Sequence, residues 1–216
     1  MRPSAAAYPR ETPPPAPRRT ALAIASAAWA LSVAGGAGAL IAYQSAPGLA
    51  PAAPAHWPAA PAFDLDPVRP TLVMFAHPRC PCARASLAEL RALLDRPDPP
   101  AAHLAFAVPD GADQEWTGND FWFAAAKIRG LVTHADRGGR LAAACGARTS
   151  GQVMIFTGDG SLLYSGGLTG SRGHEGGNGG LDAASRALDT GAAAPSFPVF
   201  GCSLLGMSGG PGVGAP

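Results

Sequence analysis

The segment Thr71–Leu94 (TLVMFAHPRCPCARASLAELRALL) restricts the possible folds of this chain more than any other. It begins with a short apolar run, Thr71–Ala76, which predicts a buried strand. Apolar residues then recur at helical spacing from Ala83 to Leu94, with charged residues between them. Two cysteines, Cys80 and Cys82, lie in the turn between these elements. The sequence therefore predicts a strand, a turn and a helix, with a pair of sulfurs at the start of the helix.

The start of a helix favours a reactive cysteine. Unpaired backbone N–H groups and the helix dipole stabilise a thiolate there. Pro81 fits the first helical position, where a missing N–H has no cost. Arg79 and Arg84 add positive charge nearby. In a redox role, we expect Cys80 to attack as the thiolate and Cys82 to resolve the mixed disulfide.

Composition limits the class of protein. The chain has 216 residues, a length that suits one domain with appendages. Its net charge is +1, and 14% of its residues are charged. No basic cluster is interleaved with aromatic residues, so we expect no nucleic-acid partner. Four cysteines are too few for a disulfide scaffold, and their uneven spacing indicates chemistry more than cross-linking.

The N-terminal region predicts a membrane anchor. Residues 1–20 form a basic, Pro/Ala-rich arm that we expect to be disordered. Ala21–Tyr43 then runs for 23 residues without a charge or a proline, and such a helix spans roughly 35 Å, more than the bilayer core of about 30 Å. Arginines precede this segment and few positive charges follow it, which predicts a cytoplasmic N-terminus and a periplasmic domain. We therefore expect a single-pass protein of the inner (cytoplasmic) membrane, with a signal peptide cleaved near Ala37-Gly38-Ala39 as the alternative.

The rest of the chain divides into an Ala/Pro-rich linker at 44–62, a folded domain at 63–190 and an irregular tail at 191–216. We expect strands at Thr71–Ala76, Ala101–Val108, Leu131–Ala135, Gln152–Thr157 and Ser161–Ser165. We expect further helices at Asp120–Ile128 (with Asp120 as N-cap), Arg140–Cys145 and Leu181–Leu188. This order implies parallel strands joined by helices and closed by an antiparallel hairpin. We therefore predict an α/β domain with a central mixed sheet flanked by helices.

Several short motifs carry a family resemblance. They are the strand before Cys80-Pro81-Cys82, Asp136 with Gly139, Cys145-Gly146-Ala147, and Asp159-Gly160. Together they resemble the thioredoxin superfamily, in particular its membrane-tethered members of the TlpA/ResA kind. A closer likeness, to the bacterial RedB-like proteins, rests on HPRCPCARASLAEL at 77–90, TSGQV at 149–153, GGLTGSRGHEG at 166–176 and FGC at 200–202. The resemblance implies a thioredoxin-like fold and thiol–disulfide chemistry on protein cysteines.

Two departures from the thioredoxin pattern bear on that chemistry. The usual dithiol has two residues between its cysteines, whereas here only Pro81 separates them. A disulfide in so small a ring is expected to be strained and easily reduced. Thioredoxins also place a cis-proline opposite the dithiol, and the matching positions here are Thr149, Ser150 and Gly151. That proline shapes the substrate groove and keeps metals off the sulfurs, so its absence leaves a ligand-binding role open.

The cysteine pair therefore has three interpretations. The first is a redox dithiol that needs no cofactor. The second is a soft-metal site for copper or zinc, in which His77 or His174 adds a ligand. The third is a pair of small buried residues in a domain that has lost catalysis. His77 can also lower the pKa of Cys80 or simply shape the turn, and His174 can be an ordinary loop residue.

The other two cysteines lie far along the chain. We expect Cys145, at the end of a helix, to be buried and inert. Cys202 lies in the tail. Three roles are open to it: pairing with Cys145, resolving the dithiol, or joining a metal site. The first functional hypothesis is a periplasm-facing oxidoreductase acting on protein cysteines, for example in the maturation of a metalloprotein or cytochrome. The alternatives are a copper or other soft-metal carrier and an inactive assembly factor.

Overall fold

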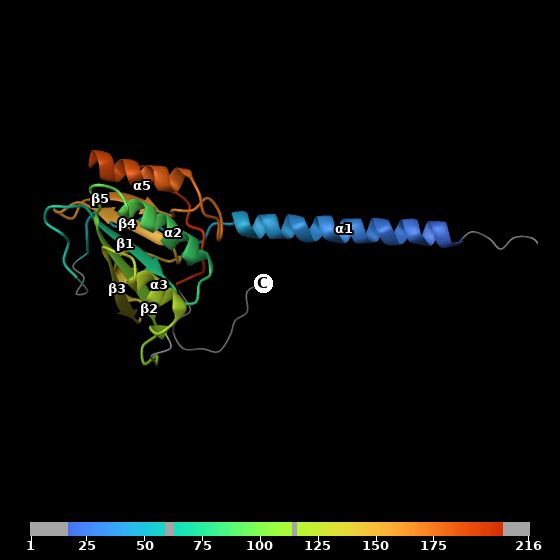
Figure 1. Ribbon diagram of the computed structural model, residues 1–216, viewed down its shortest axis with the longest axis horizontal. Helices are drawn as coiled ribbons and strands as arrows, with labels where there is room; N and C mark the ends of the chain where they lie inside the picture. Colours follow the sequence, from blue (N-terminus) through green and yellow to red (C-terminus); the bar gives the residue numbers. More distant parts are fainter. Residues whose placement is uncertain (1–16, 59–62, 114–115, 205–216) are drawn as a thin grey trace, which may run out of the picture. The chain divides into compact units, whose positions relative to one another are not determined.

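The computed structural model describes residues 17–58, 63–113 and 116–204 (Figure 1). The chain divides into two compact units, Met1–Ala42 and Tyr43–Pro216. Helix α1 (Pro17–Ser45) makes up the described part of the first unit. Among the described residues, Arg18–Ser45 is the one helix whose length and apolar composition suit it to cross a membrane. A single-pass anchor fits this helix, and a signal sequence shares the same properties.

The second unit is built on a five-stranded mixed sheet. Its strands are β1 (Thr71–Ala76), β2 (Ala101–Val108), β3 (Leu131–Arg137), β4 (Gln152–Phe156) and β5 (Leu162–Gly166), in the order β3-β2-β1-β4-β5 (Figure 1). Strands β1, β2 and β3 run parallel, and β4 is antiparallel to both β1 and β5. The flanking helices are α2 (Cys82–Leu94), α3 (Asp120–Ala126), α4 (Arg140–Ala144) and α5 (Gly179–Thr190). This is the mixed sheet flanked by helices that the element order predicted, and it agrees with the thioredoxin-like fold that the resemblance implied.

Strand β1 is central, and its side chains alternate between two cores. All six of its residues are buried. Leu72 and Met74 belong to the larger core, to which α2, α3 and α5 contribute, whereas Val73 and Phe75 belong to the smaller core beside α4. Because β1 is packed on both faces, its C-terminal end is held firmly, and the turn with the two cysteines follows directly from that end.

The helix starts differ from the sequence predictions by one or two residues. Helix α2 begins at Cys82 with Pro81 as its N-cap, so that Cys80 precedes the cap. The N-cap of α3 is Asn119 rather than Asp120. Asn119 has an extended backbone, and its side-chain oxygen accepts a hydrogen bond from the backbone N–H of Trp122 at 3.0 Å. That geometry leaves Asp120 inside the first turn, where its charge complements the helix dipole.

The linker and the tail pack on the domain instead of standing off it. In the linker, Gly48 N donates to Val199 O at 2.8 Å and Trp57 N donates to Gly160 O at 2.7 Å. The Trp57 ring packs edge-on against Phe156. The described part of the tail forms isolated bridges between Gly166 and Phe197 and between Thr149 and Ser203. Residues 47–58 of the predicted linker therefore lie against the domain, while positions 59–62 and 205–216 lie outside the described residues.

Candidate functional site

Cys80 lies between the C-terminal end of β1 and the start of α2. Its side chain and backbone are almost fully buried, with 1% of the residue exposed. The Cys80 N–H donates to His77 O at 3.0 Å, which closes the turn. The burial comes from the sheet, from α2 and from the C-terminal tail, so the sulfur is shielded but lies at the edge of the core.

Several hydrogen-bond donors surround the sulfur of Cys80. They include the thiol and the backbone N–H of Cys202, the hydroxyl of Ser150 and the backbone N–H of Ala83, and the Cys82 thiol is a further donor. The Cys202 nitrogen lies 3.4 Å from Cys80 Sγ. These bonds, with the Cys202 thiol first among them, lower the pKa of Cys80 to about 5 against the opposing effect of burial. Cys80 is therefore a thiolate at neutral pH.

Cys82 has the opposite electrostatic environment. It is half-buried, and burial, followed by the negative charge of Cys80, raises the pKa of its thiol. The Arg172 guanidinium beside it acts in the other direction. The two sulfurs of the Cys-Pro-Cys turn are therefore unequal, with one thiolate and one thiol at neutral pH.

Cys202 approaches Cys80 from the C-terminal tail. Ser150 N donates to Cys202 O at 2.8 Å, so the tail pairs with the loop opposite the dithiol. A Cβ atom at Gly201 would overlap the carbonyl oxygen of Ser150, which shows how closely the tail is packed there. The pKa of the Cys202 thiol is raised, mainly because this thiol donates its hydrogen to Cys80.

The positions that correspond to the missing cis-proline form this loop. Ser150 Oγ accepts from His77 N at 2.9 Å, and Thr149 Oγ1 donates to Leu49 O at 2.7 Å. Gly151 has a φ of +94° and donates its N–H to Phe75 O at 2.8 Å. A proline at Gly151 could adopt neither that φ nor that hydrogen bond. No cis peptide bond occurs in the part of the chain that the structure describes.

Arg172 is the side chain of the glycine-rich loop that reaches the cysteines. Its Nη1 donates to Gly201 O at 2.5 Å, and its guanidinium lies 4.9 Å from the ring centroid of Tyr43. His174, a candidate metal ligand, lies in the same loop. His174 is exposed, and its backbone N–H contacts Ser171 O at 3.4 Å.

His77 and Arg79 shape the turn before Cys80. His77 is half-buried, and its Nδ1 accepts from the Arg79 N–H at 3.1 Å. Burial lowers the pKa of His77, so its imidazole is neutral at pH 7 and supplies no fixed positive charge. Both side chains pack on Trp116, with the His77 ring edge-on and the Arg79 guanidinium 4.7 Å from the ring centroid.

Cys145 lies in the smaller core, on the other face of the sheet. It is fully buried, and burial raises its pKa to about 12. Pairing with Cys202, which packs against the larger core, is therefore excluded in this structure because the sheet separates them. All four cysteines are free. Within residues 17–58, 63–113 and 116–204, no three or more His, Cys, Asp or Glu side chains are grouped so that they could hold a metal ion.

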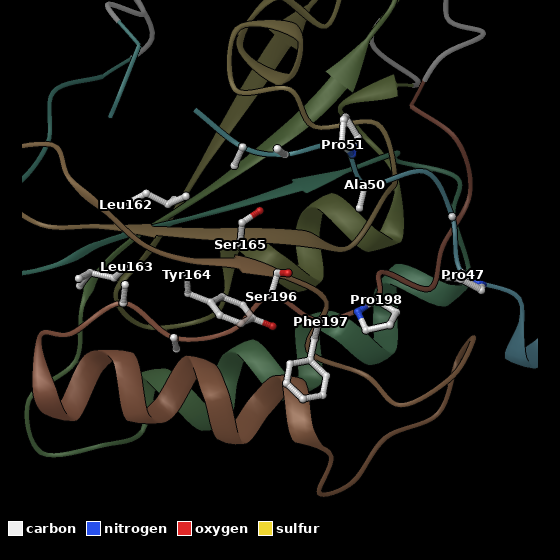
Figure 2. Close-up of a pocket in the computed structure, with 15 residues that line it drawn as sticks. Pro47, Ala50, Pro51, Leu162, Leu163, Tyr164, Ser165, Ser196, Phe197 and Pro198 are labelled. Carbon is white, nitrogen blue, oxygen red and sulfur yellow. The ribbon is translucent and has the colours of Figure 1, made fainter. Parts of the chain in front are cut away.

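A hollow beside strand β5 lies away from this chemistry. It encloses about 850 Å³ between β5, the linker and residues 193–198 (Figure 2). Tyr164, Ser196 and Phe197 line it, and none of the lining residues is a cysteine or histidine. The Tyr164 hydroxyl donates to Gly167 O at 2.7 Å. The candidate functional residues remain those around Cys80.

Comparison with known proteins gives the fold. No protein-family model matches the chain, and no curated protein matches it significantly. A crystal structure of an uncharacterized conserved protein from Geobacillus kaustophilus is similar, with 20% identity, a TM-score of 0.55, and coverage of 77% of this chain and 100% of the other. A hypothetical protein from Sinorhizobium meliloti has 21% identity and a TM-score of 0.54, covering 71% and 94%. An exposed lipoprotein thioredoxin of Streptococcus pneumoniae has 20% identity and a TM-score of 0.39, covering 56% and 84%.

Proposed function

We propose that this protein is a membrane-anchored thiol–disulfide oxidoreductase that acts on protein cysteines through its Cys-Pro-Cys turn, with Cys80 as the attacking thiolate. The observation that carries the proposal is the environment of Cys80 Sγ. A buried sulfur that accepts hydrogen bonds from Cys202, Ser150 and the start of α2 is stabilised as an anion. A structural cysteine such as Cys145 has no such donors and a raised pKa.

The proposed reaction is thiol–disulfide exchange in two steps. The Cys80 thiolate attacks one sulfur of a protein disulfide, and the other substrate sulfur leaves with the electron pair and takes a proton. A second thiol of this protein then loses its proton and attacks Cys80 Sγ, which releases the second substrate sulfur as a thiol. The substrate disulfide is reduced and this protein is oxidised. With an oxidised protein and a substrate dithiol, the same steps run in reverse.

Helix α1 supports a location at the membrane. Its composition suits a single span, and Arg18 and Arg19 lie at its N-terminal end. By the positive-inside tendency, the N-terminus stays in the cytoplasm and the thioredoxin-like unit is in the periplasm. Disulfide chemistry persists in that compartment.

The test is reduction of a model protein disulfide by dithiothreitol, catalysed by the full-length chain in detergent. Cys80→Ser is expected to abolish catalysis to the uncatalysed rate, because no other described sulfur has a lowered pKa. Cys145→Ser is the matched control and is expected to leave the rate unchanged. Equal rates for Cys80→Ser and the unmodified chain would refute the proposal. One equivalent of copper or zinc that co-purifies under reduction and protects the thiols would favour the metal carrier instead.

A further inference from the structure

The tail cysteine lies beside the attacking sulfur, and we propose that Cys202, rather than Cys82, is the thiol that resolves mixed disulfides on Cys80. The disulfide formed during turnover is then Cys80–Cys202. This inference rests on the proposed function, because it assigns the second sulfur of the same reaction. Sequence spacing gave that role to Cys82, since it is the nearest cysteine along the chain.

The first argument is proximity. The Cys202 nitrogen lies 3.4 Å from Cys80 Sγ, and one N–Cα bond adds about 1.46 Å, so the Cys202 Cα is within about 5 Å of that sulfur. The Cys202 thiol itself donates a hydrogen bond to the Cys80 sulfur. The two sulfur atoms are therefore already neighbours before any reaction occurs. A disulfide between them spans a comparable distance from sulfur to the opposite Cα.

The second argument is the geometry of the Cys-Pro-Cys turn. Pro81 has helical dihedral angles (φ −66°, ψ −33°), and Cys82 is the first residue of α2. The Cys82 thiol also hydrogen-bonds to Cys80. A Cys80–Cys82 disulfide, however, would close a ring with only Pro81 between the two cysteines, and so small a ring is strained. A Cys80–Cys202 disulfide closes no such ring.

The third argument is that the tail is fixed in place. Ser150 N donates to Cys202 O, and Leu204 N donates to Arg148 O, each at 2.8 Å. Arg172 Nη1 donates to Gly201 O at 2.5 Å. These three hydrogen bonds flank Cys202 on both sides, so the cost of ordering its backbone has been met by folding. A thiol held in this way attacks a neighbouring disulfide faster than a thiol on a mobile segment.

The resolution of the mixed disulfide conserves atoms and electrons. After Cys80 has formed a mixed disulfide with the substrate, the Cys202 thiol loses its proton to solvent and attacks Cys80 Sγ. The Cys80–Cys202 bond forms as the bond from Cys80 to the substrate sulfur breaks, and that sulfur leaves with the electron pair and takes a proton. A dithiol of a partner protein then reduces Cys80–Cys202 and restores both thiols. Cys82 is left available as a thiol for that exchange.

The experiment uses the full-length reduced protein in detergent, oxidised with glutathione disulfide, quenched by alkylation and digested with trypsin. Cleavage after Arg79 and Arg84 puts Cys80 and Cys82 in one peptide, and Cys202 lies in the peptide that follows Arg186. We expect a cross-link between these peptides in the unmodified chain and in Cys82→Ser, which assigns the link to Cys80. Cys145→Ser is the matched control and should give the same link.

The decisive variant is Cys202→Ser, whose hydroxyl keeps a hydrogen-bond donor near Cys80 but cannot form a disulfide. It is expected to accumulate the Cys80–glutathione mixed disulfide and to resolve it about 100-fold more slowly than the unmodified chain does. The reason is that a neighbouring thiol has a high effective concentration. If Cys82→Ser accumulates the mixed disulfide and Cys202→Ser does not, the inference is overturned while the oxidoreductase remains. If Cys80→Ser still catalyses disulfide reduction, the proposed function itself fails.

Discussion

At the scale of single residues, environment separates cysteines that are chemically identical. Cys80 and Cys145 are both buried, yet the pKa of one is lowered and that of the other is raised. The difference is that Cys80 Sγ accepts hydrogen bonds from Cys202, Ser150 and Ala83, whereas burial dominates at Cys145. Reactivity at this site therefore depends on donors contributed by three separate segments of the chain.

The lowered pKa of Cys80 predicts an unusual pH profile for alkylation by iodoacetamide. Because the pKa is lowered from 9.0 to about 5, the thiolate fraction is near one from pH 8 down to pH 6 and falls by half near pH 5. The alkylation rate of Cys80, measured by peptide mass spectrometry, is expected to be flat across that upper range. A tenfold loss of rate for each pH unit below 8 would contradict this. Cys202→Ala should raise the apparent pKa more than Cys202→Ser does.

At the scale of elements, the C-terminal tail completes the site by packing on the Thr149–Gly151 loop. Gly201 allows this close approach, since a Cβ there would overlap Ser150 O. The glycine-rich loop contributes through Arg172, and Glu89 of α2 accepts a hydrogen bond from Gly176 N of that loop at 2.5 Å. Tail and loop thus support each other around the sulfurs.

Gly201→Ala is expected to displace the tail from the loop. The Cys80 sulfur then loses both donors of Cys202, so its pKa rises. A rise of one unit lowers the thiolate fraction at pH 6 from about 0.9 to about 0.5, so alkylation at pH 6 is expected to slow by about twofold or more. Gly177→Ala is the matched control, because a Cβ at that exposed glycine meets no atom within 4 Å. Identical alkylation rates for the two variants would show that the tail does not control Cys80.

A second element-scale prediction concerns the histidine pair between β2 and β3. His103 Nδ1 lies 2.8 Å from His134 Nε2, and burial, followed by His134, lowers the pKa of His103 to about 4. Between about pH 6.5 and pH 4, the unfolded chain binds a proton at His103 that the folded chain does not, so the free energy of unfolding falls as the pH falls through that range. Urea titrations at several pH values should show a smaller fall in the free energy of unfolding for His103→Phe, whose ring can keep the stacking on Phe63. Equal slopes of the free energy of unfolding against pH for the variant and the unmodified chain would contradict the prediction.

The sequence alone predicted the elements that have a clear pattern of apolar residues. The bounds of β1 and β2 coincide with the predicted Thr71–Ala76 and Ala101–Val108, because continuous apolar runs mark buried parallel strands. The linker and tail lack any period, so their packing could not be foreseen. Cys202 lies 122 residues from Cys80 in sequence, and only the folded chain brings the two together. Arg172 lies in the motif GGLTGSRGHEG, which sequence reasoning noted. The position of its guanidinium beside the cysteines depends on the same long-range contacts and could not be predicted.

At the scale of the whole molecule, the chain combines an apolar helix with a thioredoxin-like unit. When the full chain is expressed in a Gram-negative host, we expect it to remain in the membrane pellet after alkaline carbonate extraction, because the span buries some 20 apolar residues in the bilayer. A chain lacking residues 1–42 should appear in the supernatant. A membrane-impermeant thiol reagent is expected to label the full chain in spheroplasts before lysis. Labelling only after lysis would place the cysteines in the cytoplasm and contradict the proposed orientation.

The most direct test of the account is a redox titration of the full-length chain in glutathione buffers, with free thiols counted at each potential. The account predicts a reversible loss of two thiols per chain in one two-electron transition, and no such transition in Cys80→Ser. If all four thiols of the unmodified chain persist in fully oxidised glutathione, or if Cys80→Ser titrates as the unmodified chain does, Cys80 is not a redox centre.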